Sequence, residues 1–365
     1  MRVGARQLVW IAAAVLALAG CSSGGDAPAA SQTSQTTSTA ATPIPVSPAG
    51  WVEEEVSFVA DGLTIYGTYR HKGDAPAPAA LLISESGNTD RNGDNAVAGP
   101  VGNMRQLAEY LSGKGIASLR FDKVGTGKTG IGPYASKPAD VGSAVYTSGA
   151  KAAVRFLAQK PGTDKTRISV YALGEGTVHA MAVATDTAPD APKVHSLGLF
   201  QPLPGRYLDI ITARVRTSID ADVASGAKSR QQGDDVLNTW NAAVEEARTK
   251  GTAPAKLPEG LGAILNPSNV KAVVETDVID PLALAAKVAP GTPVLVTCSD
   301  SDSQAGCASE KPLTAALAHT ALTVLELKGV NHVLRDDPSD NVANYSKQDP
   351  LSAQLVTGLD GFVGK

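Results

Sequence analysis

Aromatic side chains, cysteine and basic charge are all scarce in this sequence, and each scarcity excludes something. Only 4% of the 365 residues are Phe, Trp or Tyr, so a buried core must be filled mainly by Ala, Val and Leu. The net charge is −4, and the chain therefore lacks the basic stripe that neutralises the phosphates of nucleic acid. We expect no nucleic acid partner. The hydrophobic share of 43% is enough for one large α/β domain or two smaller ones.

The apolar run near the start of the chain is too short for a comfortable membrane span. It occupies residues 8–20, follows Arg2 and Arg6, and is typical of an export signal. The run ends in LAGC, which resembles a bacterial lipobox. This resemblance implies a lipoprotein signal peptide at residues 1–20 and a lipid-modified Cys21, which would anchor the protein to the membrane of the bacterial cell envelope on its extracytoplasmic side. An ordinary signal peptide with an incidental cysteine is the alternative.

The segment that follows the lipobox has the composition of a flexible stalk. Residues 21–48 contain almost no large apolar side chains and show no periodicity. Such a segment cannot bury enough surface to offset the entropy of ordering its backbone. We therefore expect residues 21–48 to be a disordered tether.

Two cysteines, Cys298 and Cys307, remain once Cys21 is assigned to the lipid. Thiols oxidise outside the cytoplasm, and a short loop closes readily, so we expect a disulfide between them. A metal site with two thiolates is the alternative, but it lacks further ligands at suitable spacing. The motifs GTGKT and DRNGDN fail the phosphate-loop and calcium-loop patterns at required positions. We expect no metal and no cofactor.

From Trp51 onward, the apolar pattern alternates between strands and helices. Residues 52–71 predict a hairpin that turns at Asp61-Gly62. Further strands are predicted at 79–84, 116–122, 167–173, 194–200, 292–300 and 321–329, with helices near 103–115, 143–160, 310–319 and 351–363. This alternation predicts an α/β fold, with a mostly parallel sheet flanked by helices.

One long segment interrupts this alternation. Residues 205–285 contain helical patterns and no convincing strand. We interpret them as a helical cap inserted into a core made of residues 49–204 and 286–365. An independent second domain is the weaker alternative, because the sheet pattern resumes after the insertion.

Four loops at predicted strand ends carry motifs that together resemble one known family. These are SESGNTDRNGDN (84–95), LRFDKVGTGKT (119–129), PVLVTCSDSDSQ (293–304) and LKGVNHVLRD (327–336). In this order they resemble the oxyanion loop, an Arg-Tyr-Asp-Lys turn, the acid loop and the histidine loop of α/β-hydrolase-fold proteins, in the serine esterase and serine-aminopeptidase-like group. The likeness extends from about Trp51 to Val363. It implies the α/β-hydrolase fold and descent from enzymes that cleave ester or peptide bonds.

The resemblance assigns Asp302 as the acid and His332 as the base of a catalytic triad. Both residues follow consecutive predicted strands, so their loops reach the same edge of the sheet. A triad base is an imidazole oriented by a buried carboxylate, which fits this pair. The other four histidines have positions that favour packing or surface roles: His71, His179, His195 and His319.

The serine of the nucleophile elbow is absent. The elbow motif of the group, Gly-His-Ser-Glu-Gly, corresponds here to residues 172–176, ALGEG, so Gly174 takes the nucleophile position without a side chain. The central residue of such an elbow has a positive φ, which glycine adopts at little steric cost. The turn can therefore survive although the hydroxyl is gone.

A second departure lies opposite the elbow. Glu85 stands where the oxyanion motif has its first Gly, and a carboxylate there opposes the negative charge of a tetrahedral intermediate. Glu85, Ser86 and Glu175 are thus the predicted residues of the oxyanion site or pocket. We expect both glutamates to be hydrogen-bonded structural acids, with activation of water as the alternative. Neither Ser84 nor Thr177 is expected to replace the nucleophile.

Three functions remain open at this point. The first, which we favour, is a pseudoenzyme retained as a binding or scaffold protein for a small acyl or peptide ligand. The second is an active hydrolase of carboxylic esters or peptide bonds, which uses His332 and Asp302 with water or a non-standard nucleophile. The third is a structural lipoprotein whose pocket is filled or closed.

Overall fold

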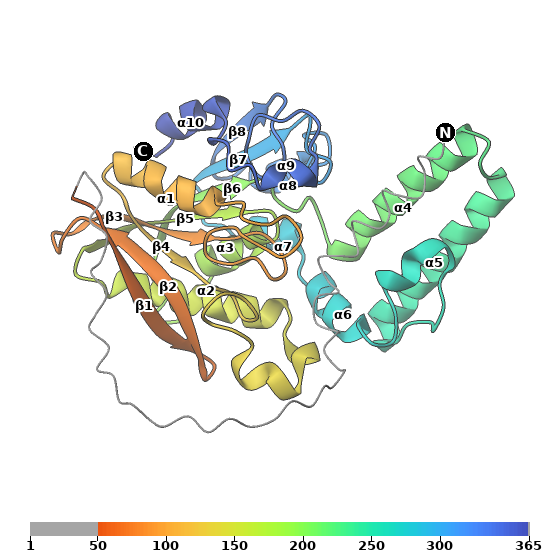
Figure 1. The fold of residues 1–365 in the computed structure, drawn as a ribbon, viewed down its shortest axis with the longest axis horizontal. Coiled ribbons are helices and arrows are strands. Elements are labelled where there is room, and N and C mark those ends of the chain that lie inside the picture. The colour runs from red at the N-terminus through yellow and green to blue at the C-terminus, as the bar shows by residue number, and fades with distance from the viewer. Residues whose placement is uncertain (1–49, 364–365) are drawn as a thin grey trace, which may run out of the picture.

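A computed structural model describes residues 50–363, apart from the side chain of Ala139. The predicted signal peptide, the lipidation site at Cys21 and the predicted tether lie outside the described residues. Among the described helices, none is both long enough and apolar enough to cross a membrane. An eight-stranded sheet with helices on both faces forms the main body, and a helical arm projects from it (Figure 1).

The sheet is mixed, because an antiparallel hairpin is joined to a parallel series. Its strands are β1 (Val52–Ala60), β2 (Leu63–His71), β3 (Ala77–Ile83), β4 (Ala117–Phe121), β5 (Thr163–Leu173), β6 (Val194–Phe200), β7 (Pro293–Ser299) and β8 (Ala321–Leu327). Their order is β1-β2-β4-β3-β5-β6-β7-β8; β2 is antiparallel to both β1 and β4, and the remaining pairs are parallel. The predicted hairpin is confirmed, since Asp61 and Gly62 have φ of 48° and 79° between the two strands.

The helices connect these strands in the predicted alternation. They are α1 (Asn103–Gly113), α2 (Ser143–Ala158), α3 (Gly176–Ala184), α4 (Tyr207–Ala224), α5 (Arg230–Lys250), α6 (Val270–Val278), α7 (Pro281–Ala285), α8 (Lys311–Ala316), α9 (Val342–Tyr345) and α10 (Ala353–Asp360), with 3-10 turns η3 (Gly132–Ser136), η4 (Pro138–Asp140) and η5 (Pro258–Ala263). α8 is shorter than the helix predicted at 310–319, because Ala318 N already bonds to Ala315 O in a tighter turn. His319 therefore lies after this helix and not within it.

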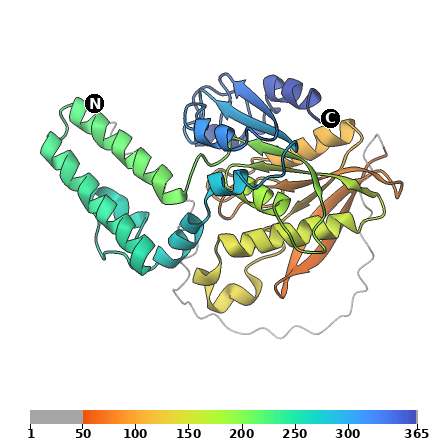
Figure 2. The same ribbon diagram turned by 180° about the vertical axis from the view of Figure 1, so that it is seen from behind.

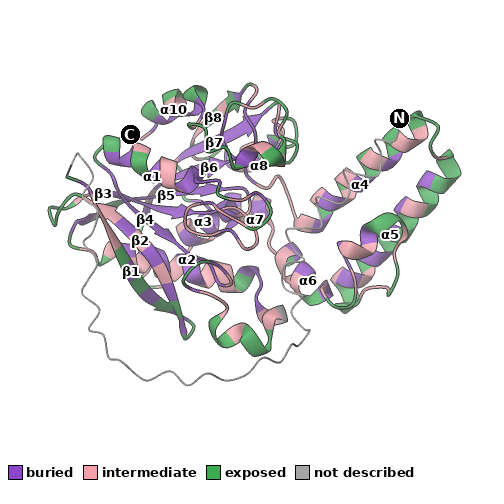
Figure 3. Ribbon diagram, viewed as in Figure 1, coloured by how far each residue is buried: buried purple, intermediate pink, exposed green. Residues whose placement is uncertain are grey.

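Helices cover both faces of the sheet, which explains why the central strands are apolar on both sides. One face packs against α2, α3, α7 and α8. The other face packs against α1 and α10. Figure 3 shows the inner strands as mostly buried and the outer surfaces of the helices as exposed. This two-sided packing leaves the ends of the strands as the place for a site.

The inserted segment forms an arm with its own small core. α4 and α5 run antiparallel and project away from the sheet (Figures 1 and 2). Trp240 is fully buried within the arm, and its indole N–H donates to Thr212 Oγ1 at 2.9 Å. At the base of the arm, Asp277 accepts hydrogen bonds at 2.8 Å from both Arg206 and Arg248. These contacts connect α6 to the start of α4 and the end of α5.

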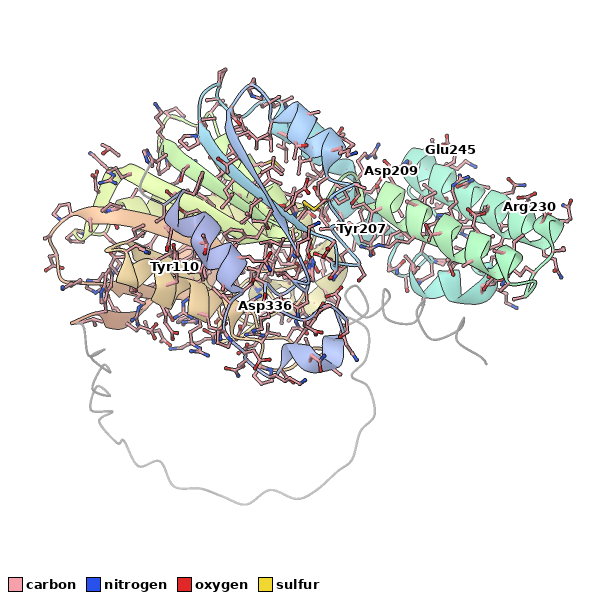
Figure 4. The ribbon with its side chains drawn as sticks, turned by 90° about the horizontal axis from the view of Figure 1, so that it is seen from above. Tyr110, Tyr207, Asp209, Arg230, Glu245 and Asp336 are labelled. Carbon is pink, nitrogen blue, oxygen red and sulfur yellow. A yellow bond between two sulfur atoms is a disulfide. The ribbon has the colours of Figure 1, made fainter. Side chains whose placement is uncertain are left out.

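The predicted disulfide between Cys298 and Cys307 is confirmed (yellow in Figure 4). Its S–S distance is 2.02 Å and its Cα–Cα distance is 4.9 Å. Cys298 belongs to β7, so the bond closes the loop that follows this strand. Asp302 lies within the closed loop.

We predict that loss of this disulfide destabilises the protein by about 2–3 kcal/mol, because the cross-link reduces the entropy of the unfolded chain. The measurement is urea unfolding of residues 50–365 with Cys298→Ser and Cys307→Ser. A reducing agent should lower the stability of the wild type to that of the double variant and leave the variant unchanged. Equal stability of all these forms would contradict the prediction.

Candidate functional site

Four loops meet at the carboxyl edge of the parallel strands, which is the edge where ligands bind in sheets of this kind. These loops follow β3, β5, β7 and β8, and they carry Glu85, Gly174, Asp302 and His332 respectively. The four residues are far apart in the sequence, and the structure brings them together.

Gly174 lies in the sharp turn between a strand and a helix. β5 ends at Leu173 and α3 begins at Gly176, so only two residues reverse the chain direction. The φ of Gly174 is +53°, in the left-handed region where a side chain is strained. Its N–H donates to Phe200 O at 3.0 Å, and its carbonyl accepts from Thr177 Oγ1 at 2.6 Å. The hydroxyl of Thr177 is thus used within the turn itself.

Asp302 and His332 form the hydrogen-bonded pair of an acid and a base. His332 Nδ1 lies 2.8 Å from Asp302 Oδ2. The other carboxylate oxygen, Oδ1, accepts from the backbone N–H of Gln304 at 2.7 Å and of Ala305 at 3.1 Å. The backbone N–H of His332 donates to Asp340 at 2.9 Å. Both side chains are buried and held in one orientation.

The carboxylate of Glu85 occupies the position that faces this pair. Its Oε2 lies 2.7 Å from His332 Nε2, the nitrogen that a nucleophile would contact. Its Oε1 accepts from the backbone N–H of Ser86 at 2.7 Å and, more weakly, of Glu175 at 3.5 Å. Backbone N–H groups from these two loops are the donors that form an oxyanion hole in hydrolases of this fold. Glu85 therefore contacts both the base and the predicted oxyanion donors.

Glu85 also uses the space that a nucleophile would need. A Cβ atom added to Gly174 would lie 1.8 Å from Glu85 Oε2. Two atoms cannot approach so closely, so the present position of Glu85 requires glycine at 174. Glu85 and Gly174, the two positions that differ from the motifs the sequence resembles, are therefore linked in the structure.

The charge of His332 follows from its two neighbours. Each ring nitrogen faces a carboxylate oxygen, and a carboxylate only accepts hydrogen bonds, so both nitrogens must carry a proton. Burial alone would lower the pKa of His332, but the charges of Asp302 and Glu85 raise it well above its usual value. Burial would raise the pKa of Glu85, but the charge and hydrogen bond of His332 and the N–H of Ser86 lower it to about 2. The site thus contains an imidazolium between two carboxylates.

A second group of charges lies beside the elbow. Lys123 donates to the backbone carbonyl of Glu85, and its buried ammonium lies 5.3 Å from the centre of the Tyr146 ring. Burial lowers the pKa of Lys123, against the charges of Glu175 and Glu85. Burial would raise the pKa of Glu175, but His179 and Lys123 lower it. Within the elbow, His179 and Lys123 thus offset the effect of burial on the pKa of Glu175.

The arm contributes one cation to the surroundings of the site. Arg214 of α4 donates a long hydrogen bond of 3.5 Å to Gln304 O. Burial lowers the pKa of its guanidinium, whereas Tyr207, Asp302 and Glu85 raise it. Tyr207 lies at the start of α4, where the arm meets the sheet domain (Figure 4). This end of the arm therefore faces the site.

Glu310 is a buried acid that the sequence motifs do not mark. Only 1% of its surface is exposed, and neither carboxyl oxygen has a hydrogen-bond partner. Burial and the charge of Asp302 raise its pKa to about 8, although His332 opposes this shift. Glu310 is therefore mostly neutral at pH 7.

The space around these groups is small. A cavity beside Glu175 and Ser143, bounded on the arm side by Tyr207 and Thr276, leaves room for about one water molecule. In the described part of the chain, no group of three or more His, Cys, Asp or Glu side chains is arranged to hold a metal ion. The polar groups at the strand ends mainly contact one another.

Comparison with known proteins identifies the fold. No family model and no curated protein matches the chain. Among solved structures, the esterase Pf2001 of Pyrococcus furiosus matches with a TM-score of 0.50 and 15% identity, over 86% of this chain and 91% of that chain. DcsB in complex with its substrate analogue matches with a TM-score of 0.53 and 15% identity, over 86% and 99%. Est1E of Butyrivibrio proteoclasticus has a TM-score of 0.49 and 14% identity, over 85% and 99%.

At these identities the likeness concerns the fold alone. The chain has the α/β-hydrolase fold, with a mostly parallel eight-stranded sheet flanked by helices. The sequence motifs pointed to the residues at 85, 174, 302 and 332. They did not indicate that Glu85 bonds directly to His332, nor the proximity of Arg214 and Glu310. Glu310 lacks a motif, and its only sequence signal is its position just after Cys307.

We predict that Glu85→Gln removes a contribution to the free energy of unfolding that the wild type loses as the pH falls. The folded pKa of Glu85 lies below its ordinary value of 4.5, so its contribution is present above pH 4.5 and is lost as the pH falls towards 2. The full shift corresponds to about 3 kcal/mol as an upper limit. Urea unfolding between pH 6 and pH 2 should therefore show a steeper loss for the wild type than for the variant. Glu245→Gln, an exposed change on α5, is the control and should follow the wild type.

Proposed function

We propose that this protein is a catalytically silent α/β-hydrolase-fold protein, derived from enzymes of the serine esterase or peptidase kind and retained as a binding or scaffold protein. The contact of 2.7 Å between Glu85 Oε2 and His332 Nε2 carries the proposal. In an active hydrolase this nitrogen takes the proton of the nucleophile. Here it is already protonated and bonded to a carboxylate of the same chain.

The absence of a hydroxyl or thiol at the elbow supports the same conclusion. Position 174 has no side chain, and a side chain there would collide with Glu85. Losing the serine of such a triad costs roughly a million-fold in turnover. The oxyanion donors of Ser86 and Glu175 are occupied as well, so transition-state stabilisation is lost together with the nucleophile.

Direct activation of water is the less favoured function. It requires a neutral imidazole or a free carboxylate as general base. His332 is paired on both nitrogens, and Glu85 has a pKa of about 2 because it is bonded to His332, which makes it a weak base. Glu175 is likewise held by Lys123 and His179.

The proposed setting is the bacterial cell envelope, with Cys21 as a lipid anchor and residues 21–48 as a tether. The proposed ligand is a small acyl or peptide molecule. It would bind where the start of α4 meets the sheet edge, and its entry requires this junction to open, because the cavity there has room for about one water molecule. Tyr207 and Arg214 supply an aromatic ring and a cation at this junction. The arm, with its own core around Trp240, supplies a further surface for binding.

We predict that the wild type neither hydrolyses p-nitrophenyl esters nor reacts with a fluorophosphonate probe. Gly174→Ser combined with Glu85→Gly should do both, because the pair of changes adds the hydroxyl, frees His332 Nε2 and vacates the N–H donors. Adding His332→Ala to this double variant should abolish both reactions.

The single variants serve as controls for this experiment. Gly174→Ser alone should stay unreactive and be less stable, because its Cβ overlaps Glu85 and its φ of +53° is strained. Glu85→Gly alone should also stay unreactive for want of a hydroxyl. Turnover by the wild type that His332→Ala abolishes would overturn the proposal. A correctly folded double variant that does not react with the probe would contradict the assignment of the elbow.

We predict that a fatty acid or a short peptide raises the melting temperature of the exported domain. A ligand at a hundred times its Kd stabilises the folded state by about 2.7 kcal/mol. A thermal-shift series with fatty acids of increasing length and with tripeptides measures this effect. Tyr207→Ala, a change at the junction of arm and sheet, should weaken it. If neither class stabilises the protein, the third function, a structural lipoprotein with a closed pocket, is favoured.

A further inference from the structure

The carboxyl group of Glu310 is the most unusual polar group in the described chain. Buried acids normally have hydrogen-bond partners, and leaving one without any is costly. Both oxygens of Glu310 are buried without a partner, and it is the only residue in the described chain for which this holds at both side-chain oxygens. Glu310 has no hydrogen bond to Asp302 or His332, so its burial calls for a separate explanation.

Two titratable groups face Glu310. Asp302, in the loop after β7, repels a negative charge at Glu310, and His332, in the loop after β8, attracts it. The single positive charge of His332 is already shared by Asp302 and Glu85, which lie 2.8 Å and 2.7 Å from its ring nitrogens. Ionised Glu310 would therefore be the third carboxylate around a single imidazolium.

The segment that carries Glu310 lies just outside the ring that the disulfide closes around Asp302. The disulfide closes its ring at Cys307, and Glu310 lies three residues beyond it, immediately before α8. Ser309 N bonds to Gly306 O, and Thr314 N bonds to Glu310 O. An outward movement of residues 308–311 would therefore leave intact the ring that contains Asp302, at the cost of the bond between Ser309 N and Gly306 O.

We propose that Glu310 is a proton-operated switch. When it is neutral, the start of α8 packs under Asp302. When it is ionised, residues 308–311 turn outward so that the carboxylate reaches water. This inference does not depend on the proposed function, because it concerns the acid beneath the site and not the nucleophile.

The sign of the pH dependence follows from the direction of the shift. The folded pKa of Glu310 is raised from 4.5 to about 8, so its stabilising contribution is complete below pH 4.5 and is lost as the pH rises to about 8. His332 has its pKa raised from 6.5 and contributes a similar loss only above pH 6.5. A loss of stability between pH 5 and pH 6.3 therefore reports on Glu310 and not on His332.

The test compares the exported domain with its Glu310→Gln variant in urea unfolding from pH 5 to pH 8.5. One proton changes the unfolding equilibrium constant up to tenfold per pH unit. We expect the wild type to lose stability at up to this rate between pH 5 and pH 6.3 relative to Glu310→Gln. Glu326→Gln, an exposed change on β8, is the matched control and should follow the wild type. Glu310→Met replaces the Gln variant if the amide prevents folding.

A second measurement reports the movement itself. Amide hydrogen exchange of residues 308–316, corrected for its intrinsic pH dependence, should increase in the wild type between pH 7 and pH 9 and stay constant in Glu310→Gln. Parallel stability curves of the wild type and Glu310→Gln would overturn the proposal. So would an increase in exchange that is equal in both proteins.

Discussion

An imidazole between two carboxylates has no lone pair left to accept a proton, and the site depends on this constraint. His332 bonds to Asp302 on one side and to Glu85 on the other. Because Glu85 has taken the second nitrogen, it also needs the room that Gly174 leaves. The same carboxylate accepts hydrogen bonds from the backbone at residues 86 and 175. The carboxylate of Glu85 thus accepts hydrogen bonds both from the imidazole of His332 and from the neighbouring backbone N–H groups.

Contacts that need no nucleophile hold the residues at this edge of the sheet. The elbow keeps its positive φ, and the disulfide still closes the loop around Asp302. Lys123 still holds the loop of Glu85 through a backbone carbonyl. These contacts stabilise the edge of the sheet whether or not any substrate binds there. The geometry of this edge therefore does not by itself require catalysis.

Much of this arrangement could be predicted from the sequence, because it depends on periodicity and spacing. Alternating apolar patterns gave the strands and helices, and loop motifs indicated positions 174, 302 and 332. No sequence pattern indicates the direction of a side chain within a loop, so the bond between Glu85 and His332 could not be predicted. The same holds for Glu310, which becomes unusual only when its burial is known. The end of α8 was misplaced because its alanine-rich sequence favours continuing the helix, whereas the chain must turn to enter β8.

The overlap between a side chain at 174 and the carboxylate at 85 also has a consequence for substitutions at either position. A serine introduced at 174 alone would overlap the carboxylate of Glu85, which would have to leave its present position beside His332. Removing the acid first would leave the imidazole without its partner and gain nothing in return. The side chains at 85 and 174 therefore constrain each other, and a change at either position alters the surroundings of His332.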